Sequence, residues 1–131
     1  MAAQLESSRA QRLLVLLEEL NLEYDIKTYK RDKNALAPEE LKNIHPLGKS
    51  PSVEIKIPGQ ETFVLAESGA IFEYLCAHFG KHLIPTRDLQ GRVGEESEEF
   101  RRNRYFMHYS EGSLMSLLAI AAVMLSIYMR K

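Results

Sequence analysis

Three polar residues lie where a helix is expected to begin, and they are candidates for binding chemistry. Ser8 precedes an apolar helical pattern, and Glu67-Ser68 stands between a strand pattern and a second helical pattern. The first N–H groups of a helix have no partner within the helix, so such an end binds anions, including carboxylates and thiolates. Ser68 therefore predicts an anion site and Ser8 a thiolate site, while Glu67 offers a negative charge to an amino group. The plain alternative at both places is an ordinary helix cap.

The Ser50-Pro51 pair is a candidate of another kind, because a proline restricts the residue before it to an extended backbone. If the bond between them is cis, the backbone N–H and C=O of Ser50 point outward like an unpaired strand edge. Such an edge can hydrogen-bond the backbone of a peptide ligand. The alternative is that Pro51 only begins a strand, a position that tolerates proline.

Other reactive side chains favour a structural role. His78 and His82 are spaced like two metal ligands on a helix, but Gly80 lies between them and no third ligand motif accompanies them. We therefore expect no metal site. Cys76 lies on the apolar face of its predicted helix, where a free thiol packs as a small hydrophobe.

The composition narrows the class of protein. The chain has 131 residues, 45% of them hydrophobic, which argues against a disordered chain and allows a domain-sized core. The 17 basic and 18 acidic side chains leave a formal net charge of -1, so nothing favours nucleic acid as a partner. A single cysteine forms no disulfide within the chain, and this is typical of a reducing compartment such as the cytoplasm.

The first eighty residues alternate between helical and strand patterns. Leucines recur at helical spacing up to Leu20, and Ser8 with Gln11 is placed as a capping box, so a helix is predicted from Arg9 to about Asn21. The other predicted elements are a half-buried strand at 24–29, a short helix at 39–44, strands at 53–57 and 62–66, and a helix at 68–79 with Ser68 and Gly80 as its caps. The last two strands are close enough to form an antiparallel hairpin.

The composition changes after a predicted linker at 83–91. A long helix is predicted over 95–110, because its acidic residues precede its basic ones in the order that the helix dipole favours. The segment 112–129 carries no charge and is followed by Arg130-Lys131. This segment is either a buried bundle helix or, at the lower limit of length, a membrane span. We favour the buried helix, so a membrane is not an expected partner.

Three stretches at compatible spacing, read together, resemble the N-terminal domain of the cytosolic glutathione transferases, in the branch common in fungi and bacteria. They are Ser8-Arg9-Ala10-Gln11-Arg12, Ile44-His45-Pro46-Leu47-Gly48-Lys49-Ser50-Pro51 and Leu65-Ala66-Glu67-Ser68. The resemblance implies an α/β (α+β) fold: a thioredoxin-like domain followed by an all-helical domain. It also implies a cis Ser50-Pro51 bond.

The same resemblance assigns roles to the candidate residues. Ser50 and Pro51 would bind the cysteinyl backbone of glutathione, Glu67 its α-amino group, and Ser68 its γ-glutamyl carboxylate. Lys49 could reach the glycyl carboxylate, or it is simply solvated. Five residues on a face of the later helix would border the electrophile pocket, or they serve core or interdomain packing: Tyr105, Phe106, Met107, His108 and Tyr109.

Ser8 is the catalytic candidate, since a hydroxyl at a helix N-terminus stabilises the bound thiolate. Two alternatives remain beside it: Ser8 could serve only as a cap, and Ser7 or Arg9 could contact the thiol instead. In several relatives the activating hydroxyl lies a few residues earlier, near Leu5, which has none.

The chain is expected to be divided at 1–85 and 86–131, as a glutathione-binding domain and the beginning of a truncated all-helical domain. Complete family members are longer and begin with a central strand. Met1-Ala2-Ala3-Gln4 is neither β-branched nor alternating, so the first strand is expected to be absent or degraded.

The leading hypothesis is a cytoplasmic glutathione transferase that acts in detoxification as a homodimer. It would conjugate glutathione, as co-substrate and with no further cofactor, to small electrophiles. One alternative is a non-catalytic glutathione- or protein-binding module of the same fold. A weaker alternative is a membrane-tethered variant, held by the apolar segment 112–129.

Overall fold

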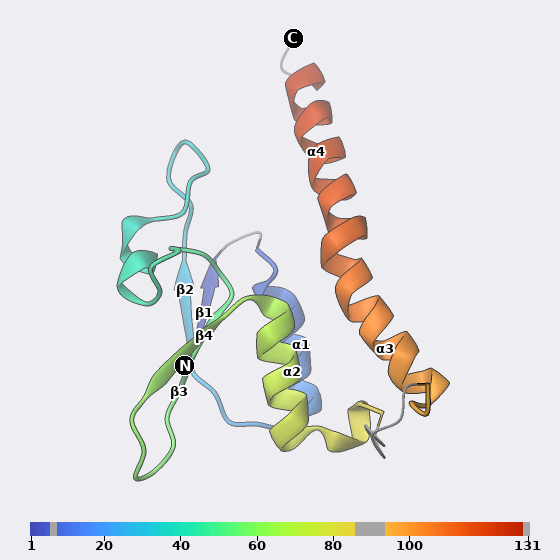
Figure 1. Cartoon of the computed structure of the whole chain (residues 1–131). Coiled ribbons are helices and arrows are strands. Elements are labelled where there is room, and N and C mark those ends of the chain that lie inside the picture. Colours follow the sequence, from blue (N-terminus) through green and yellow to red (C-terminus); the bar gives the residue numbers. More distant parts are fainter. Residues whose placement is uncertain (6–7, 86–93, 130–131) are drawn as a thin grey trace. The chain divides into compact units, whose positions relative to one another are not determined.

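The structure is a computed structural model that describes residues 1–5, 8–85 and 94–129 (Figure 1). These residues divide into two compact units, Met1–Gly80 and Lys81–Lys131. The first unit contains a sheet covered by helices, and the second is helical. The predicted mixture of helices and strands followed by helix alone is therefore confirmed.

The sheet of the first unit has four strands in the order β2-β1-β3-β4. Their bounds are β1 Ala2–Leu5, β2 Ile26–Tyr29, β3 Ser52–Ile55 and β4 Phe63–Ala66. β1 is parallel to β2 and antiparallel to β3, and β3 and β4 form the predicted antiparallel hairpin. A strand that is parallel to one neighbour and antiparallel to the other has to lie inside the sheet, and β1 does.

The expectation that the first strand is absent or degraded is wrong. Ala2 pairs with Ile26 on one side and Val53 on the other, and Ala2, Ala3 and Leu5 are all buried. Tertiary pairing overrides the weak intrinsic strand preference of alanine, because a central strand gains two rows of backbone hydrogen bonds and two packed faces. Small side chains also suit a strand that is covered on both faces.

Two helices lie side by side on one face of this sheet (Figure 1). They are α1 Ala10–Glu19 and α2 Ser68–Phe79, and they bury Leu13 and Ile71 almost completely. The opposite face carries a short 3-10 helix, η1 Glu39–Asn43, whose Leu41 packs with Ala3, Leu5 and Tyr29. Both faces of β1 are therefore covered.

The helix beginnings differ from their predictions in a way that matters for the site. The predicted capping box of Ser8 and Gln11 is wrong, because the N-cap of α1 is Arg9 and no side chain caps it. The Ser8 hydroxyl instead accepts a hydrogen bond from the Ala10 N–H at 3.2 Å. Ser68 is the first residue of α2 and not its cap, which is Glu67. Gly80 ends α2, as predicted.

The second unit begins with a short 3-10 helix, η2 Lys81–Leu83, and continues after the undescribed residues with a long helical run. Its segments are α3 Glu98–Tyr109, a π-helical turn η3 Ser110–Leu114, and α4 Met115–Met129. The Ser97 hydroxyl caps α3 by accepting from the Phe100 N–H at 3.1 Å. The predicted long helix therefore begins at Glu98 and does not end near Ser110.

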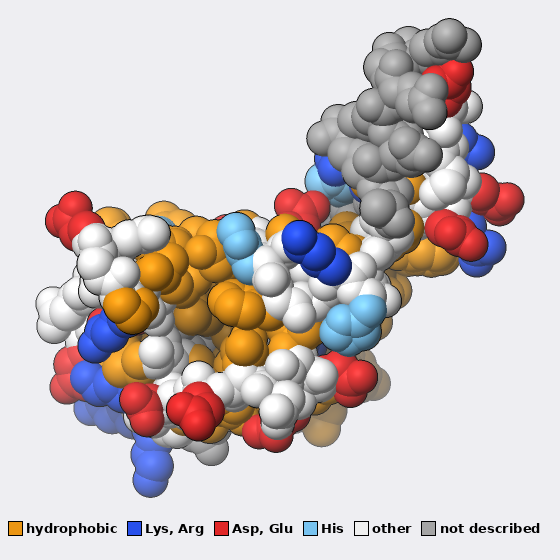
Figure 2. Space-filling view, turned by 90° about the horizontal axis from the view of Figure 1, so that it is seen from below, with side chains coloured by type: hydrophobic (Ala, Val, Ile, Leu, Met, Phe, Trp, Pro, Cys, Tyr) orange, Lys and Arg blue, Asp and Glu red, His pale blue; other side chains and the backbone are white. Residues whose placement is uncertain are grey.

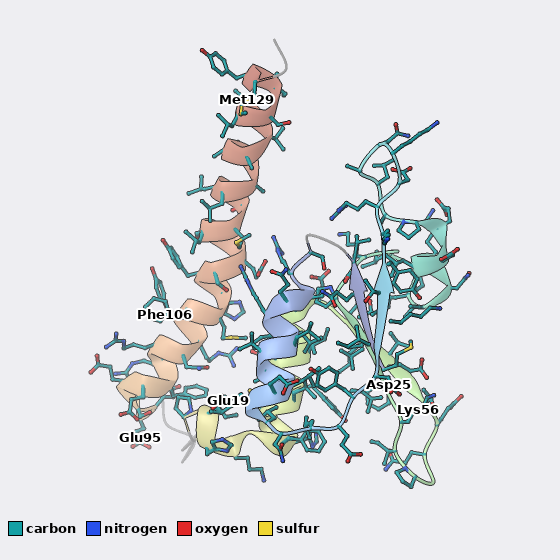
Figure 3. The ribbon with its side chains drawn as sticks, turned by 180° about the vertical axis from the view of Figure 1, so that it is seen from behind. Glu19, Asp25, Lys56, Glu95, Phe106 and Met129 are labelled. Carbon is teal, nitrogen blue, oxygen red and sulfur yellow. The ribbon has the colours of Figure 1, made fainter. Side chains whose placement is uncertain are left out.

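The helical run Glu98–Met129 has 32 residues and is long and apolar enough to cross a membrane. No residue of its most apolar window is buried, and Figure 3 shows Phe106 and Met129 projecting from it. The central helix of a soluble bundle is equally apolar, so length and composition do not distinguish a buried bundle helix from a membrane span. Predicted segment 112–129 forms a helix in either case.

Leu13 and Val15 of α1 test how much the first unit depends on the helix-to-sheet core. Leu13→Ala should lower the free energy of unfolding by about 2–5 kcal/mol, because Leu13 is buried and its removal leaves a cavity. Val15→Ala on the exposed side of the same helix should change it by less than about 0.5 kcal/mol. Urea unfolding followed by circular dichroism measures both, and equal losses would contradict the described packing.

Candidate functional site

The candidate residues of the first unit gather at one end of the sheet. β1 ends at Leu5, three residues before Ser8 in the sequence, and Ala3 pairs with Ser52, which in turn pairs with Ala66. The Ser50-Pro51 turn precedes Ser52, and Glu67-Ser68 follow Ala66. The register therefore brings Ser8, Ser50 and Ser68 to the end of the sheet at which α1 and α2 begin.

The Ser50-Pro51 bond is cis, as the resemblance implied. Pro51 and Ser52 are buried, and the Ser52 hydroxyl donates to the Lys49 carbonyl oxygen at 3.0 Å, which closes the turn. The Lys49 side chain is exposed at the same turn. Gly48 has a φ of 58°, and a Cβ there would lie 2.9 Å from Cγ of Lys42, so the turn requires glycine.

The Ser50 side chain is bound to the neighbouring strand. Its hydroxyl donates to the Ala3 carbonyl oxygen at 3.0 Å and accepts from the Leu5 N–H at 3.0 Å. The hydroxyl oxygens of Ser50 and Ser8 are 3.3 Å apart. The cis turn, the end of β1 and the beginning of α1 therefore share one hydrogen-bonded cluster.

Glu67 and Ser68 form the second part of the site. Glu67 has a φ of 69°, in a region that costs a residue with a Cβ about 1–3 kcal/mol. Its carbonyl oxygen accepts the first helical hydrogen bond, from the Ile71 N–H at 3.0 Å, so the N–H groups of residues 68–70 precede the helical ladder. Ser68 is buried and the Glu67 side chain is exposed. The N-terminus of α2, which can bind an anion, therefore lies directly beside the exposed carboxylate of Glu67.

This arrangement suits a ligand that carries both charges. The helix N-termini and the exposed Lys49 attract carboxylates or a thiolate, whereas Glu67 attracts an ammonium group. The backbone at Ser50 offers hydrogen bonds to an extended peptide. No sequence pattern could have shown that the Ser50 side chain contacts Ser8, because 42 residues separate the two.

The remaining candidates do not join this cluster. Among the described residues there is no group of three or more His, Cys, Asp and Glu side chains placed to hold a metal ion. The His78 ring lies 4.4 Å from the Tyr74 ring, which places it in an aromatic contact. Ser7, an alternative for the thiol contact, lies outside the described residues, and Arg9 supplies the backbone N-cap of α1.

Cys76 is a buried free thiol, as predicted. Burial raises the pKa of the Cys76 thiol, because the thiolate loses its hydration when it is enclosed by apolar side chains. A raised pKa makes this cysteine a poor nucleophile at neutral pH. It therefore belongs to the core and not to the site.

A groove of about 460 Å³ lies at the opposite end of the sheet. It is lined by the start of β1, the far ends of β3 and α2, and the loop at 22–25. Figure 2 shows apolar side chains gathered in a hollow on this side, and Figure 3 shows Asp25 and Lys56 beside each other there. The groove includes none of the residues predicted for the site.

The aromatic residues of α3 belong to the second unit. Tyr105, Phe106 and Tyr109 are exposed, and the rings of Tyr105 and Tyr109 are stacked with centroids 5.6 Å apart. The two alternatives for these residues, an electrophile pocket or core or interdomain packing, both remain predictions.

Comparison with known proteins gives consistent results. The family model described as "Glutathione S-transferase, N-terminal domain" matches residues 4–77. The chain is 44% identical over 124 residues to Glutathione S-transferase 1 of Saccharomyces cerevisiae, a match that covers 92% of this chain and 49% of that protein. It is similar to the crystal structure of a glutathione S-transferase from Actinobacillus pleuropneumoniae, with 30% identity, a TM-score of 0.73 and coverage of 93% and 52%.

A second solved structure is similar in fold. It is a glutathione transferase family member from Pseudomonas fluorescens with two glutathione bound, and it shares 20% identity and a TM-score of 0.59, with coverage of 85% of this chain and 45% of that one. The chain thus spans about half the length of the relatives it matches.

Glu67→Gly should raise the free energy of unfolding by about 1 kcal/mol, because glycine adopts a φ of 69° without strain. Glu61→Gly, in the exposed hairpin loop, is the control and should be neutral or slightly destabilising. Chemical denaturation measures both. A lower stability of Glu67→Gly would show that the Glu67 side chain contributes more than its backbone strain costs.

The buried thiol predicts a pH dependence. The folded-state pKa of Cys76 is raised, so the folded protein holds this proton above the pH at which the unfolded chain releases it, about 8.5. The free energy of unfolding should therefore fall as pH rises through this value, and it should fall less steeply in Cys76→Ala. Parallel slopes in urea titrations at several pH values would contradict this.

Proposed function

Because this chain belongs to the glutathione S-transferase family through its N-terminal domain, we propose that it binds glutathione at the end of the sheet where Ser8, Ser50 and Ser68 lie. The Met1–Gly80 unit has the thioredoxin-like fold of that family. The observation that carries the proposal is the cluster itself: a cis Ser50-Pro51 turn whose serine lies 3.3 Å from the serine at the start of α1. A relative of the same fold is described with glutathione bound, which supports the choice of ligand.

Each part of glutathione has a matching group in this arrangement. The backbone N–H and C=O of Ser50, before Pro51, bind the cysteinyl backbone. Ser68 and the N–H groups at the start of α2 bind the γ-glutamyl carboxylate, and the exposed Glu67 binds the α-amino group. Lys49 binds the glycyl carboxylate from the adjoining turn.

The proposed reaction is the conjugation of glutathione to an electrophile, in which the glutathione sulfur forms a new bond to an electrophilic carbon. The thiol releases its proton to solvent, and the Ser8 hydroxyl donates a hydrogen bond to the resulting thiolate at the positive end of α1. The thiolate then attacks the electrophilic carbon and displaces its leaving group, or it adds to an activated double bond, and the anion formed by addition takes a proton from solvent. Protein groups contribute position and electrostatics, and glutathione is the co-substrate.

The division of the chain is part of the proposal. Residues 1–85 form the glutathione-binding domain, and residues 86–131 begin an all-helical domain whose aromatic residues on α3 border the electrophile. The separation of two compact units near residue 80 supports this division. The apolar surface of α4 would then be covered by further helices; membrane tethering through the same helix is the competing assignment.

The same proposal places the protein in the cytoplasm, as a homodimer that acts in detoxification. The free, buried Cys76 is compatible with a reducing compartment. Sedimentation of the purified chain would test the dimer, and cell fractionation would test the location: recovery with membranes that resists high salt would favour tethering.

Glutathione should retain the purified chain on an affinity resin and protect it from unfolding. At a concentration one hundred times Kd, the added free energy of unfolding should be about 2.7 kcal/mol. Absence of both retention and protection would contradict the proposed site. Turnover of a generic aromatic electrophile then separates an enzyme from the alternative, a binding module that retains affinity without turnover.

Glu67→Gln should weaken glutathione binding by about tenfold to a hundredfold, because it removes the charge that pairs with the α-amino group. Glu61→Gln makes the same chemical change at an exposed position in the hairpin loop and should leave Kd unchanged. Isothermal titration calorimetry measures both constants. Equal affinities of the two variants would remove Glu67 from the site.

A further inference from the structure

The Ser50 hydroxyl forms hydrogen bonds with β1 where the pairing between β1 and β3 ends. The Ala2 N–H donates to the Asp25 carbonyl oxygen, on the β2 side of β1. The Met1 carbonyl oxygen accepts from the Glu54 N–H, on the β3 side. Backbone groups of successive strand residues point to opposite sides, so Ala3 and Leu5 also face β3. The β1–β3 register ends at Ala3, however.

Ser50 forms hydrogen bonds with β1 at Ala3, the last residue paired with β3, and at Leu5, which lies beyond that pairing. Its hydroxyl accepts from the Leu5 N–H and donates to the Ala3 carbonyl, both at 3.0 Å. The central strand is therefore held to the cis turn by a side chain at the point where the backbone ladder stops.

The hydrogen bonds of Ser50 also determine the direction of its bond to Ser8. A serine hydroxyl has one proton and two acceptor positions. The Ser50 proton is donated to Ala3, so the proton between the two hydroxyl groups, whose oxygens are 3.3 Å apart, has to come from Ser8. Ser8 in turn accepts from the Ala10 N–H at 3.2 Å.

We infer that Ser50 is a positioning residue for Ser8: its hydroxyl, fixed to β1, accepts the Ser8 proton in the free site and holds the Ser8 oxygen where it can donate to a bound thiolate. This inference rests on the proposed function, in which Ser8 stabilises the thiolate of glutathione. It concerns the Ser50 side chain, whereas the proposed binding of the cysteinyl backbone uses the Ser50 main chain.

Binding then requires a single hydrogen bond to change partner. The Ser8 proton turns from Ser50 to the sulfur, and the Ser8 oxygen keeps its bond from Ala10. Ser50 keeps its bonds to Ala3 and Leu5, so its hydroxyl still has two partners after the Ser8 proton has turned to the sulfur. The bond that breaks is the longest of the Ser50 set, at 3.3 Å.

The test is the pH titration of the thiolate absorbance of bound glutathione, measured as a difference between the full chain with and without glutathione. Ser8→Ala should raise the apparent pKa of the bound thiol and leave about tenfold less thiolate at neutral pH. Ser50→Ala should shift it in the same direction, and Ser8→Ala/Ser50→Ala should shift it no further than Ser8→Ala alone. Ser50→Thr, which keeps the hydroxyl, should restore the wild-type titration.

Ser52→Ala is the matched control, because the buried Ser52 hydroxyl belongs to the same turn but bonds Lys49 and not Ser8. It should lower the melting temperature without moving the titration. If Ser50→Ala does not fold, Ser50→Cys keeps a side chain of similar size with weaker hydrogen bonds, and it should move the titration by part of the Ser8→Ala shift.

Three results would overturn the inference while the glutathione site stands: an unmoved titration in the Ser50 variants, additive shifts in the double variant, or an unmoved titration in Ser8→Ala. Failure of the wild-type chain to bind glutathione would instead overturn the proposed function. The two failures are therefore distinguishable.

Discussion

Strand β1 has to satisfy backbone hydrogen bonds on both of its sides, and the rest of the first unit is arranged around this requirement. β2 supplies one side along the whole strand, whereas β3 supplies the other only as far as Ala3. The cis turn brings the Ser50 hydroxyl to the Ala3 carbonyl oxygen, where the pairing with β3 ends, and to the Leu5 N–H beyond it. The end of the sheet is thus closed by the same residue that approaches Ser8, so the stability of the central strand and the geometry of the candidate site depend on one side chain.

Local patterns in the sequence were sufficient to predict most of the fold. Apolar spacing predicted α1 and α2, and the short separation of the strand patterns at 53–57 and 62–66 predicted the hairpin of β3 and β4. The missing prediction was β1, because Ala2-Ala3-Gln4 has no strand pattern of its own. Its conformation is imposed by neighbours that come from residues 26–29 and 52–53, and no local preference records such pairing.

The candidate site was predictable where one short segment carries it. The cis bond at Ser50-Pro51 followed from the motif, and so did the position of Glu67-Ser68 at the start of a helix. The strained backbone of Glu67 and the contact between Ser8 and Ser50 were not predictable. Both arise from tertiary structure: one from the sharp turn between β4 and α2, the other from two loops that only the sheet brings together.

The π-helical turn between α3 and α4 has a consequence for any partner of this long helix. An α-helix turns by about 100° per residue, and a π turn accommodates one additional residue within the helix. The row of side chains that contains Tyr105 and Tyr109 is therefore displaced around the axis before it reaches α4. The Ser116 hydroxyl lies 2.8 Å from the Gly112 carbonyl oxygen and 3.0 Å from the Ser113 carbonyl oxygen, so its single proton is shared between the last residues of the π turn. A straight neighbouring helix therefore cannot contact one continuous row of side chains along both α3 and α4. The aromatic residues of α3 and the aliphatic residues of α4 face different directions around the helix axis.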